Sequence, residues 1–304
     1  MKNKPIPVIL DTDIGGDIDD TWALSMLLGS PELDLRLVVT EHGDTEYRAA
    51  LAAKFLEVAG HAHVPIGIGV SDLSYSTDKN QAPWLGGYSL SDYHGAVYQD
   101  GVQAMIDLIL TSEEPVTIIA IGVVTNLAKA LEIEPRIAEK CRFVGMHGSV
   151  YKGYGDSDEI SAEANVVNDV PSFRKVIAAP WIDRLITPLD TCGVVVFEGT
   201  RYQEVFHSSL PRMQAVIENY QVWSSLVKWV QVDYFQAKTS TLFDCVAVYL
   251  AYDESFCEIQ EVRLRTDDKG FNHIDPNGAP VRAAIAWKDP DGFYDHLVER
   301  LLSD

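Results

Sequence analysis

Short apolar runs alternate with longer stretches of spaced apolar residues through the first 190 residues of the chain. Short continuous apolar runs are typical of buried strands, and spaced apolar positions over ten or so residues predict helices. Alternation of the two favours a mostly parallel sheet with helices on both faces. The predicted strands are Val8–Leu10, Leu35–Thr40, Val64–Ile68, Val116–Ile121, Phe143–Met146 and Leu185–Leu189, and the predicted helices are Ala23–Leu28, Tyr47–Val58, Val102–Leu110, Asn126–Ile133 and Ser172–Ala178.

Three further segments complete the predicted fold. Ser71–Asp100 is a polar connection without clear periodicity, which predicts a lid or binding loop, or alternatively a disordered excursion. Pro211–Ala237 looks helical, and the tail predicts two strands, Glu258–Leu264 and Val281–Trp287, before a closing helix Pro290–Leu302. Most aromatic residues of the helical segment are expected in the core, with one or two capping a pocket: Tyr220, Trp223, Trp229 and Tyr234.

No repeat, low-complexity tract or linker divides the sequence. We therefore expect one α/β domain over residues 1–304, with a mostly parallel, mixed and open sheet flanked by helices. Ligands of such sheets bind outside the carboxyl ends of the strands, so that residues distant in sequence converge there.

The formal net charge of −21 narrows the choice of partner. Nucleic acid and anionic membrane surfaces would be repelled, so a neutral small molecule is the better match. No apolar run is long enough to cross a bilayer, and the N-terminus leads into a predicted strand without a signal-like stretch, so we expect a cytoplasmic protein. The four cysteines form no C-x-x-C pair, which predicts buried, reduced thiols.

The most informative local feature is DTDIGGDIDD, Asp11–Asp20, which carries five carboxylates and two glycines directly after an apolar run. Like charges at this density repel one another unless a metal, arginines or water neutralise them. Because the loop contains neither Cys nor His, it predicts a site for a hard cation with oxygen ligands, such as Ca²⁺.

Three other interpretations compete with a cation site in this loop. An EF-hand loop lies between two helices and ends in a bidentate Glu, whereas here a strand comes first and the twelfth position is Trp22. A phosphatase of the aspartyl-phosphate type also has D-x-D after its first strand but needs a downstream Lys and acid pair that is not evident. The third alternative is a solvated acidic turn, which the apolar flanks argue against.

The loop resembles the N-terminal fingerprint of the nucleoside hydrolase family, the inosine-uridine type N-ribohydrolases, in its DxDxGxDxDD variant. Four later segments resemble further family motifs: IIAIGVVTNL resembles TGPLTN, EANVVND resembles AEFNxxxDP, PLDT resembles PLDVT, and FDCVAV resembles HDPLAV. In addition, LVVT followed by Gly43-Asp44 resembles the second strand and its VxGN turn. Segments in this order over 250 residues make a chance match improbable.

The resemblance implies hydrolysis of the N-glycosidic bond of ribonucleosides, giving ribose and free base. It implies a Ca²⁺ held by Asp13, Asp20, Asp244 and the backbone carbonyl of Ile121, with Asp13 also acting as general base on a metal-bound water. It further implies a homodimer or homotetramer. The alternative of another class is a calcium-dependent nucleoside- or ribose-binding protein without turnover.

For the substrate, the resemblance assigns Asp19, Glu163 and Asn165 to the ribose hydroxyls. Asp17 keeps the spacing from Asp13 that the short motif gives its ribose-binding Asp, whereas Asp19 keeps the spacing to the helix, and we align Asp19. The alternative role of Glu163 and Asn165 is in a helix N-terminal cluster with Asn168 and Asp169. Four further residues are substrate-contact candidates, namely Asp44, His94, His147 and Phe243.

The chain also departs from the family pattern. Phe243 stands where uridine-cleaving members use an imidazole near the leaving base, and Asp44 stands for an Asn. His147 stands for a Gly, and Ser157 for a ribose-binding Asn. These departures bear on base specificity and on ribose geometry, but they leave the predicted metal ligands in place.

Overall fold

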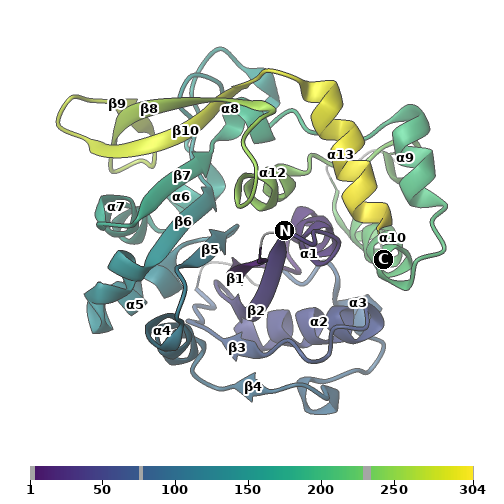
Figure 1. The fold of residues 1–304 in the computed structure, drawn as a ribbon. Helices are drawn as coiled ribbons and strands as arrows, with labels where there is room; N and C mark the ends of the chain where they lie inside the picture. Colours follow the sequence, from purple (N-terminus) through teal and green to yellow (C-terminus); the bar gives the residue numbers. More distant parts are fainter. Residues whose placement is uncertain (1–3, 75–77, 229–233, 304) are drawn as a thin grey trace.

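The computed structural model describes residues 4–74, 78–228 and 234–303, and the strands found there join in one sheet. The sheet order is β4-β3-β2-β1-β5-β6-β7-β10-β8-β9 (Figure 1). The strands are β1 Ile6–Thr12, β2 Leu33–Thr40, β3 Ile66–Ile68, β4 Val97–Tyr98, β5 Val116–Ala120, β6 Cys141–Met146, β7 Asp183–Thr187, β8 Cys257–Thr266, β9 Asn272–Ile274 and β10 Ala279–Trp287.

The sheet is parallel from β4 to β10, and β8 and β9 extend it in the antiparallel sense. β1 lies in the middle of the parallel part, between β2 and β5. The loop that follows β1 is therefore flanked on both sides by loops from neighbouring strands, which is the place where parallel sheets bind ligands.

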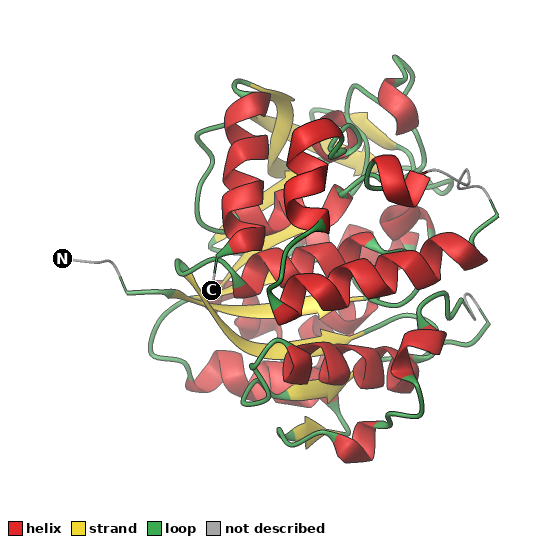
Figure 2. Cartoon of the chain, turned by 90° about the vertical axis from the view of Figure 1, so that its right-hand side faces the viewer, coloured by secondary structure: helices red, strands yellow, loops and turns green. Residues whose placement is uncertain are grey.

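Two apolar cores lie on opposite faces of the sheet. Successive residues of β1 alternate between them, with Val8 and Leu10 in one core and Ile9 in the other, as the period of two of a strand requires. The first core lies under α1, α2, α10, α12 and α13, and the second under α4, α5 and α7 (Figure 1). Figure 2 shows the helices of the first group in front of the strands.

Several helices begin at a capping residue or a proline. Asp44 caps α2, Asp100 caps α4, and Asp169 caps α7, each through its side chain. The α-helices are α1 Asp19–Leu28, α2 Thr45–Val58, α3 Ala82–Leu85, α4 Gly101–Thr111, α5 Thr125–Ile133, α6 Ala164–Val167, α7 Val170–Ala178, α8 Leu189–Cys192, α9 Gly199–Phe206, α10 Pro211–Leu226, α11 Tyr234–Ala237, α12 Phe243–Leu250 and α13 Pro290–Leu302, and the 3₁₀ helices are η1 Leu90–Asp92, η2 Pro135–Lys140 and η3 Tyr154–Asp156.

The predicted fold class is confirmed, with differences in detail. α1 begins at Asp19 rather than Ala23, because acidic residues in the first turn are favoured by the helix dipole. The described part of the Ser71–Asp100 connection contains α3, η1 and the edge strand β4, which the sequence did not predict, and it is not a disordered excursion. Trp229 lies outside the described residues.

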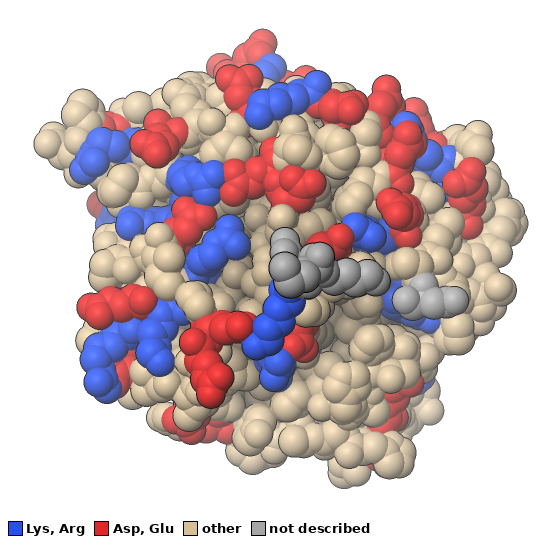
Figure 3. Space-filling model, in the orientation of Figure 1, with Lys and Arg blue, Asp and Glu red and all other residues tan. Residues whose placement is uncertain are grey.

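The tail contains one strand more than predicted. β9 pairs with β8 as a hairpin, and the two predicted tail strands and the closing helix are present as β8, β10 and α13. No described helix is long and apolar enough to cross a membrane. On the face seen in Figure 3, Lys and Arg side chains lie among Asp and Glu side chains instead of forming a basic patch.

Candidate active site

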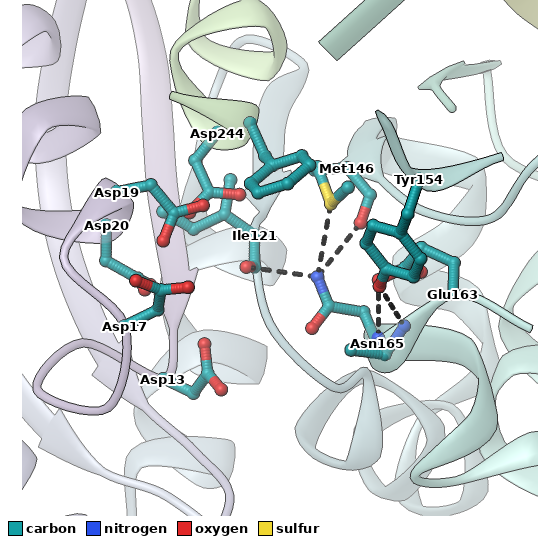
Figure 4. A pocket seen from close by; sticks show the side chains of 12 residues that line it. Asp13, Asp17, Asp19, Asp20, Ile121, Met146, Tyr154, Glu163, Asn165 and Asp244 are labelled. Atoms are coloured by element: carbon teal, nitrogen blue, oxygen red, sulfur yellow. Dashed lines mark hydrogen bonds between the residues drawn. The ribbon is translucent and has the colours of Figure 1, made fainter. Parts of the chain in front are cut away.

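A pocket of about 170 Å³ lies at the carboxyl ends of β1, β5 and β6 (Figure 4). We call it the acidic pocket because five of its lining residues carry carboxylates on one side and a sixth faces them. Its lining residues are Asp13, Asp17, Asp19, Asp20, Ile121, Met146, Tyr154, Glu163, Ala164, Asn165, Phe243 and Asp244.

Three buried carboxylates meet at one side of this pocket. Each of Asp19, Asp20 and Asp244 offers an oxygen, and these oxygens lie within 4.8 Å of one another. Asp19 and Asp20 open α1, and Asp244 is the second residue of α12, so two helix N-termini direct their positive ends at the group.

The electrostatic state of this group follows from its burial. Burial, together with repulsion from neighbouring aspartates, raises the pKa of Asp19, Asp20 and Asp244 well above the usual value of a carboxyl group. The Thr12 hydroxyl donates a hydrogen bond to Asp20 and opposes part of this shift. Such a group has to be neutralised by protons or by a cation, and a set of oxygen donors matches a hard cation.

Asp13 lines the same pocket but lies apart from that group of three. Its carboxylate is 4.0 Å from the guanidinium of Arg48, and its side chain is 24% exposed. The three carboxylates that lie closest together are thus those of Asp19, Asp20 and Asp244. The predicted ligand set has Asp13 in place of Asp19. Asp13 precedes a loop of five residues before α1, whereas Asp19 and Asp20 are fixed by the helix itself.

Arg48 ties two of the loops around Asp13 together. This buried side chain donates to the carbonyl of Ile14 at 2.9 Å and to the carbonyl of His42 at 2.6 Å. The first carbonyl belongs to the loop after β1 and the second to the loop after β2. Because Arg48 is held in α2, the position of Asp13 depends on a helix that does not itself line the acidic pocket.

The turn after β5 supplies a backbone carbonyl to the pocket. The amide of Ile121 donates to the carbonyl of Asp11 at 2.9 Å, and the carbonyl of Ile121 accepts from the side chain of Asn165 at 3.3 Å. Gly122 follows, and a Cβ there would lie 2.5 Å from Glu41 and 2.9 Å from Asp13. Only glycine therefore lets the turn approach the two carboxylates so closely.

Glu163 combines a structural role with its place in the pocket. Its carboxylate accepts from the backbone amides of Gly148, Asn165 and Val166, at 2.8, 2.7 and 3.3 Å, and so caps α6. Burial raises its pKa to about 7. The side-chain nitrogen of Asn165 also donates to the carbonyl of Met146 at 3.1 Å, and Figure 4 shows its oxygen turned to the side of Asp13.

Three predicted substrate contacts lie outside this pocket. Asp44 caps α2 and pairs with Lys79 at 2.5 Å. The His94 ring is largely exposed and lies 2.6 Å from Glu57. His147 is fully buried between aromatic rings, and its Nε2 lies 3.0 Å from the carbonyl of Gly122. Cap formation accounts for the position of Asp44, an exposed pair with Glu57 for that of His94, and core packing for that of His147.

Two further residues of this region were not among the site residues predicted from the sequence. Tyr154 comes from η3 and lies edge-on to Phe243, with ring centroids 6.2 Å apart. Asp11 is fully buried and accepts from Asn126 at 2.8 Å. Burial raises the pKa of Asp11 to about 7. Asp11 lies near the end of β1, at the start of the acidic motif, whereas no local pattern signals Tyr154.

Comparison with known proteins defines the class of the chain. Residues 8–289 match the family model described as inosine-uridine preferring nucleoside hydrolase. The chain therefore belongs to this family, as its motifs predicted, and the family is one of enzymes.

Individual relatives agree with this assignment. The chain is 32% identical to the non-specific ribonucleoside hydrolase RihC of Klebsiella pneumoniae over 180 residues, covering 56% of this chain and 57% of that protein. It is 25% identical to the pyrimidine-specific ribonucleoside hydrolase RihA of Escherichia coli over 317 residues, covering 97% and 98%. The chain thus spans little more than half of RihC but nearly all of RihA.

Solved structures share the fold. A plant nucleoside hydrolase, PpNRh1, superposes with a TM-score of 0.81 at 20% identity, covering 99% of this chain and 100% of that one. The predicted resemblance and the predicted architecture are both confirmed.

Proposed function

We propose that the protein hydrolyses the N-glycosidic bond of ribonucleosides and releases ribose and free base in a calcium-dependent reaction. The observation that carries this proposal is the meeting of Asp19, Asp20 and Asp244 in a pocket that also contains Asp13. Family membership supports it, as does similarity to RihC and RihA, which are named ribonucleoside hydrolases.

Ca²⁺ is the cation that the donor set suits best. Asp13, Asp20, Asp244 and the carbonyl of Ile121 would hold it, and all four line the acidic pocket. Calcium takes six to eight oxygen ligands, so such a set leaves room for water and for two sugar hydroxyls. When bound, the cation would lower the pKa of a water molecule and neutralise the buried carboxylates.

The protein's own groups would then perform two tasks. Asp13 takes a proton from the attacking water, a role that suits an aspartate set apart from the group of three, partly open to solvent and 4.0 Å from the guanidinium of Arg48. Asp19, Glu163 and Asn165 hold the ribose hydroxyls, which fixes the anomeric carbon near Asp13. Because Phe243 has no hydrogen-bonding group, it can pack against the substrate but cannot assist departure of the base.

The deciding experiment measures ribose release from a panel of nucleosides. The protein as purified, the protein treated with chelator, and the chelated protein resupplied with Ca²⁺, Mg²⁺ or Zn²⁺ are compared. We expect release that chelator abolishes and Ca²⁺ restores. Calcium-dependent binding of nucleosides without any release would contradict hydrolysis and favour the binding-protein alternative. The cytoplasmic location, the single domain and the oligomeric state stay predictions.

A further inference from the structure

A second hollow, of about 360 Å³, adjoins the acidic pocket. Two residues, Asp13 and Asp17, line both cavities, so the two are neighbours across the loop that follows β1. The hollow differs in its chemistry, since an imidazole, two amides and an indole contribute to its wall. The residues that matter here are Asp13, Asp17, His42, Asn80, Asn168 and Trp223.

His42 is held in this wall by an unusual backbone conformation. Its φ is +58°, and Asp156 is the other non-glycine residue with positive φ in the described ranges. Histidine enters this left-handed region more readily than most residues, but the conformation still costs energy and occurs often at functional sites. The hydrogen bond from Arg48 to the His42 carbonyl fixes the conformation, and the same guanidinium lies 4.0 Å from Asp13.

The geometry points to His42 as the residue that contacts the leaving nucleobase; this inference rests on the proposed function. A ribose held by Asp19, Glu163 and Asn165 would have its anomeric carbon near Asp13, which is one of the two residues that line both cavities. A base attached to that carbon can then enter the hollow, where the imidazole of His42 donates a hydrogen bond to a ring nitrogen or carbonyl oxygen of the base. The amides of Asn80 and Asn168 offer further donors and acceptors.

This placement of His42 would also supply the imidazole that is missing at position 243, where the chain has Phe. Phe243 lines the acidic pocket and not the hollow, His147 is buried in the core, and the exposed ring of His94 lies beside Glu57. Of the imidazoles considered, His42 is the one that borders a cavity next to Asp13. Its hydrogen bond would stabilise the negative charge that develops on a purine or pyrimidine as the glycosidic bond breaks.

The test compares substrates that differ only in the leaving group. Inosine and uridine need help to depart, whereas p-nitrophenyl riboside does not. His42→Gly removes the ring and suits the positive φ, and His42→Asn keeps both the backbone preference and a hydrogen-bond donor. His273→Ala, in the β9 hairpin where the ring pairs with Asp267, is the matched control.

We expect His42→Gly to lower kcat/KM for inosine and uridine by about 10²-fold, mainly through kcat, and to change kcat/KM for p-nitrophenyl riboside by less than about threefold. His42→Asn should recover part of the loss, and His273→Ala should lose nothing. An equal loss on all three substrates would overturn the inference, because His42 would then act only by positioning Arg48 and Asp13. An unchanged rate on all three would overturn it as well.

A binding measurement keeps this inference separate from the proposed function. Calorimetric titration with inosine and with free ribose, in the presence of Ca²⁺, is made in an Asp13→Asn background, so that inosine is bound and not turned over. His42→Gly should weaken the binding of inosine and leave that of ribose unchanged. If the wild-type protein releases no ribose from any substrate, the proposed hydrolysis fails, yet this difference in binding still supports contact with the base. Equal weakening of both ligands, or of neither, contradicts that contact.

Discussion

Carboxylates at the two ends of the parallel sheet have opposite surroundings: at one end they cluster with one another, and at the other they pair with arginines. At the carboxyl end, Asp19, Asp20 and Asp244 are buried together, and burial with repulsion from neighbouring aspartates raises the pKa of each. At the amino end, Asp183 of β7 lies 2.8 Å from Arg282 of β10 and 3.5 Å from Arg142 of β6.

We call the second group, completed by Glu254 beside Arg282, the arginine cluster. Its charges balance within the protein, and its side chains are only partly buried. Such pairs link neighbouring elements and contribute modestly to stability. Buried carboxylates that cluster with one another indicate a bound ligand instead. The comparison therefore separates the functional carboxylates from the structural ones.

The largest expected effect concerns Asp13. Asp13→Asn keeps an oxygen for the cation but cannot accept a proton, so kcat should fall by about 10² to 10⁴-fold while ribose binding is retained. Asp244→Ala should lose calcium and ribose binding together, and Asp183→Asn in the arginine cluster should leave kcat unchanged. Steady-state kinetics and ribose titrations measure both quantities. If Asp13→Asn lost binding as severely as Asp244→Ala, Asp13 would be a ligand only.

Calcium should stabilise the wild-type protein and release protons. At a free concentration 100-fold above its Kd, a ligand specific for the folded state adds about 2.7 kcal/mol to the free energy of unfolding. Because the carboxylates in the acidic pocket have raised pKa values, calcium should displace protons from them near neutral pH. Calorimetry in buffers of different ionisation enthalpy counts those protons. Stabilisation by Zn²⁺ but not by Ca²⁺ would contradict the choice of cation.

His147 tests whether burial alone marks a functional group. It is a buried titratable residue, but packing between aromatic rings in the core explains its position. Burial lowers its pKa from 6.5 to about 4. The unfolded chain therefore takes up this proton first as pH falls, and stability that is fully present above about pH 6.5 is lost toward pH 4, to the order of 3 kcal/mol. We expect His147→Gln to lack this part of the pH dependence. Unfolding curves of both proteins at pH 7 and pH 4 measure the difference, and parallel losses would exclude His147 as its source.

The smallest effect is also the most direct comparison of the two ends. In metal-free protein at pH 8, Asp244→Asn should relieve repulsion and stabilise the fold by about 1 kcal/mol. Asp183→Asn should weaken the arginine cluster and destabilise the fold by up to about 1 kcal/mol. The opposite signs matter more than the sizes. Chemical denaturation of the two variants and the wild type measures both changes in the free energy of unfolding. Changes of the same sign would contradict the difference between the two ends of the sheet.

Sequence patterns predicted the parallel strands β1, β2, β3, β5, β6 and β7 because each contains a short apolar run that alternates with helical segments. They did not predict β4 or β9, which have two and three residues and form only where a neighbouring strand offers an edge. The motifs placed Asp13, Asp19, Asp20, Glu163, Asn165, Phe243 and Asp244 together, and all of them line one pocket.

Other parts of the site had no local signal. In the sequence, Arg48 looks like an ordinary residue of a predicted helix. The packing of α2 against β2 directs its side chain to the loops after β1 and β2. His42 lies in a turn whose positive φ cannot be read from its neighbours. Tyr154 reaches the pocket from η3, far along the chain from the acidic loop. These placements arise from contacts between distant segments, which periodicity does not record.

The hydrogen bonds of Arg48 bear on how this site can be moved between proteins. The ten-residue acidic motif looks portable, as if it could be grafted after any suitable strand. Yet its geometry depends on a guanidinium from α2, on Gln81, which donates to the Asp17 carbonyl at 2.8 Å, and on Asn80, which donates to the Gly16 carbonyl at 3.0 Å. A transplanted loop without these three donors would keep its charges and lose its shape. The functional unit is therefore the loop together with Arg48, Gln81 and Asn80, and a redesign has to transfer all of them.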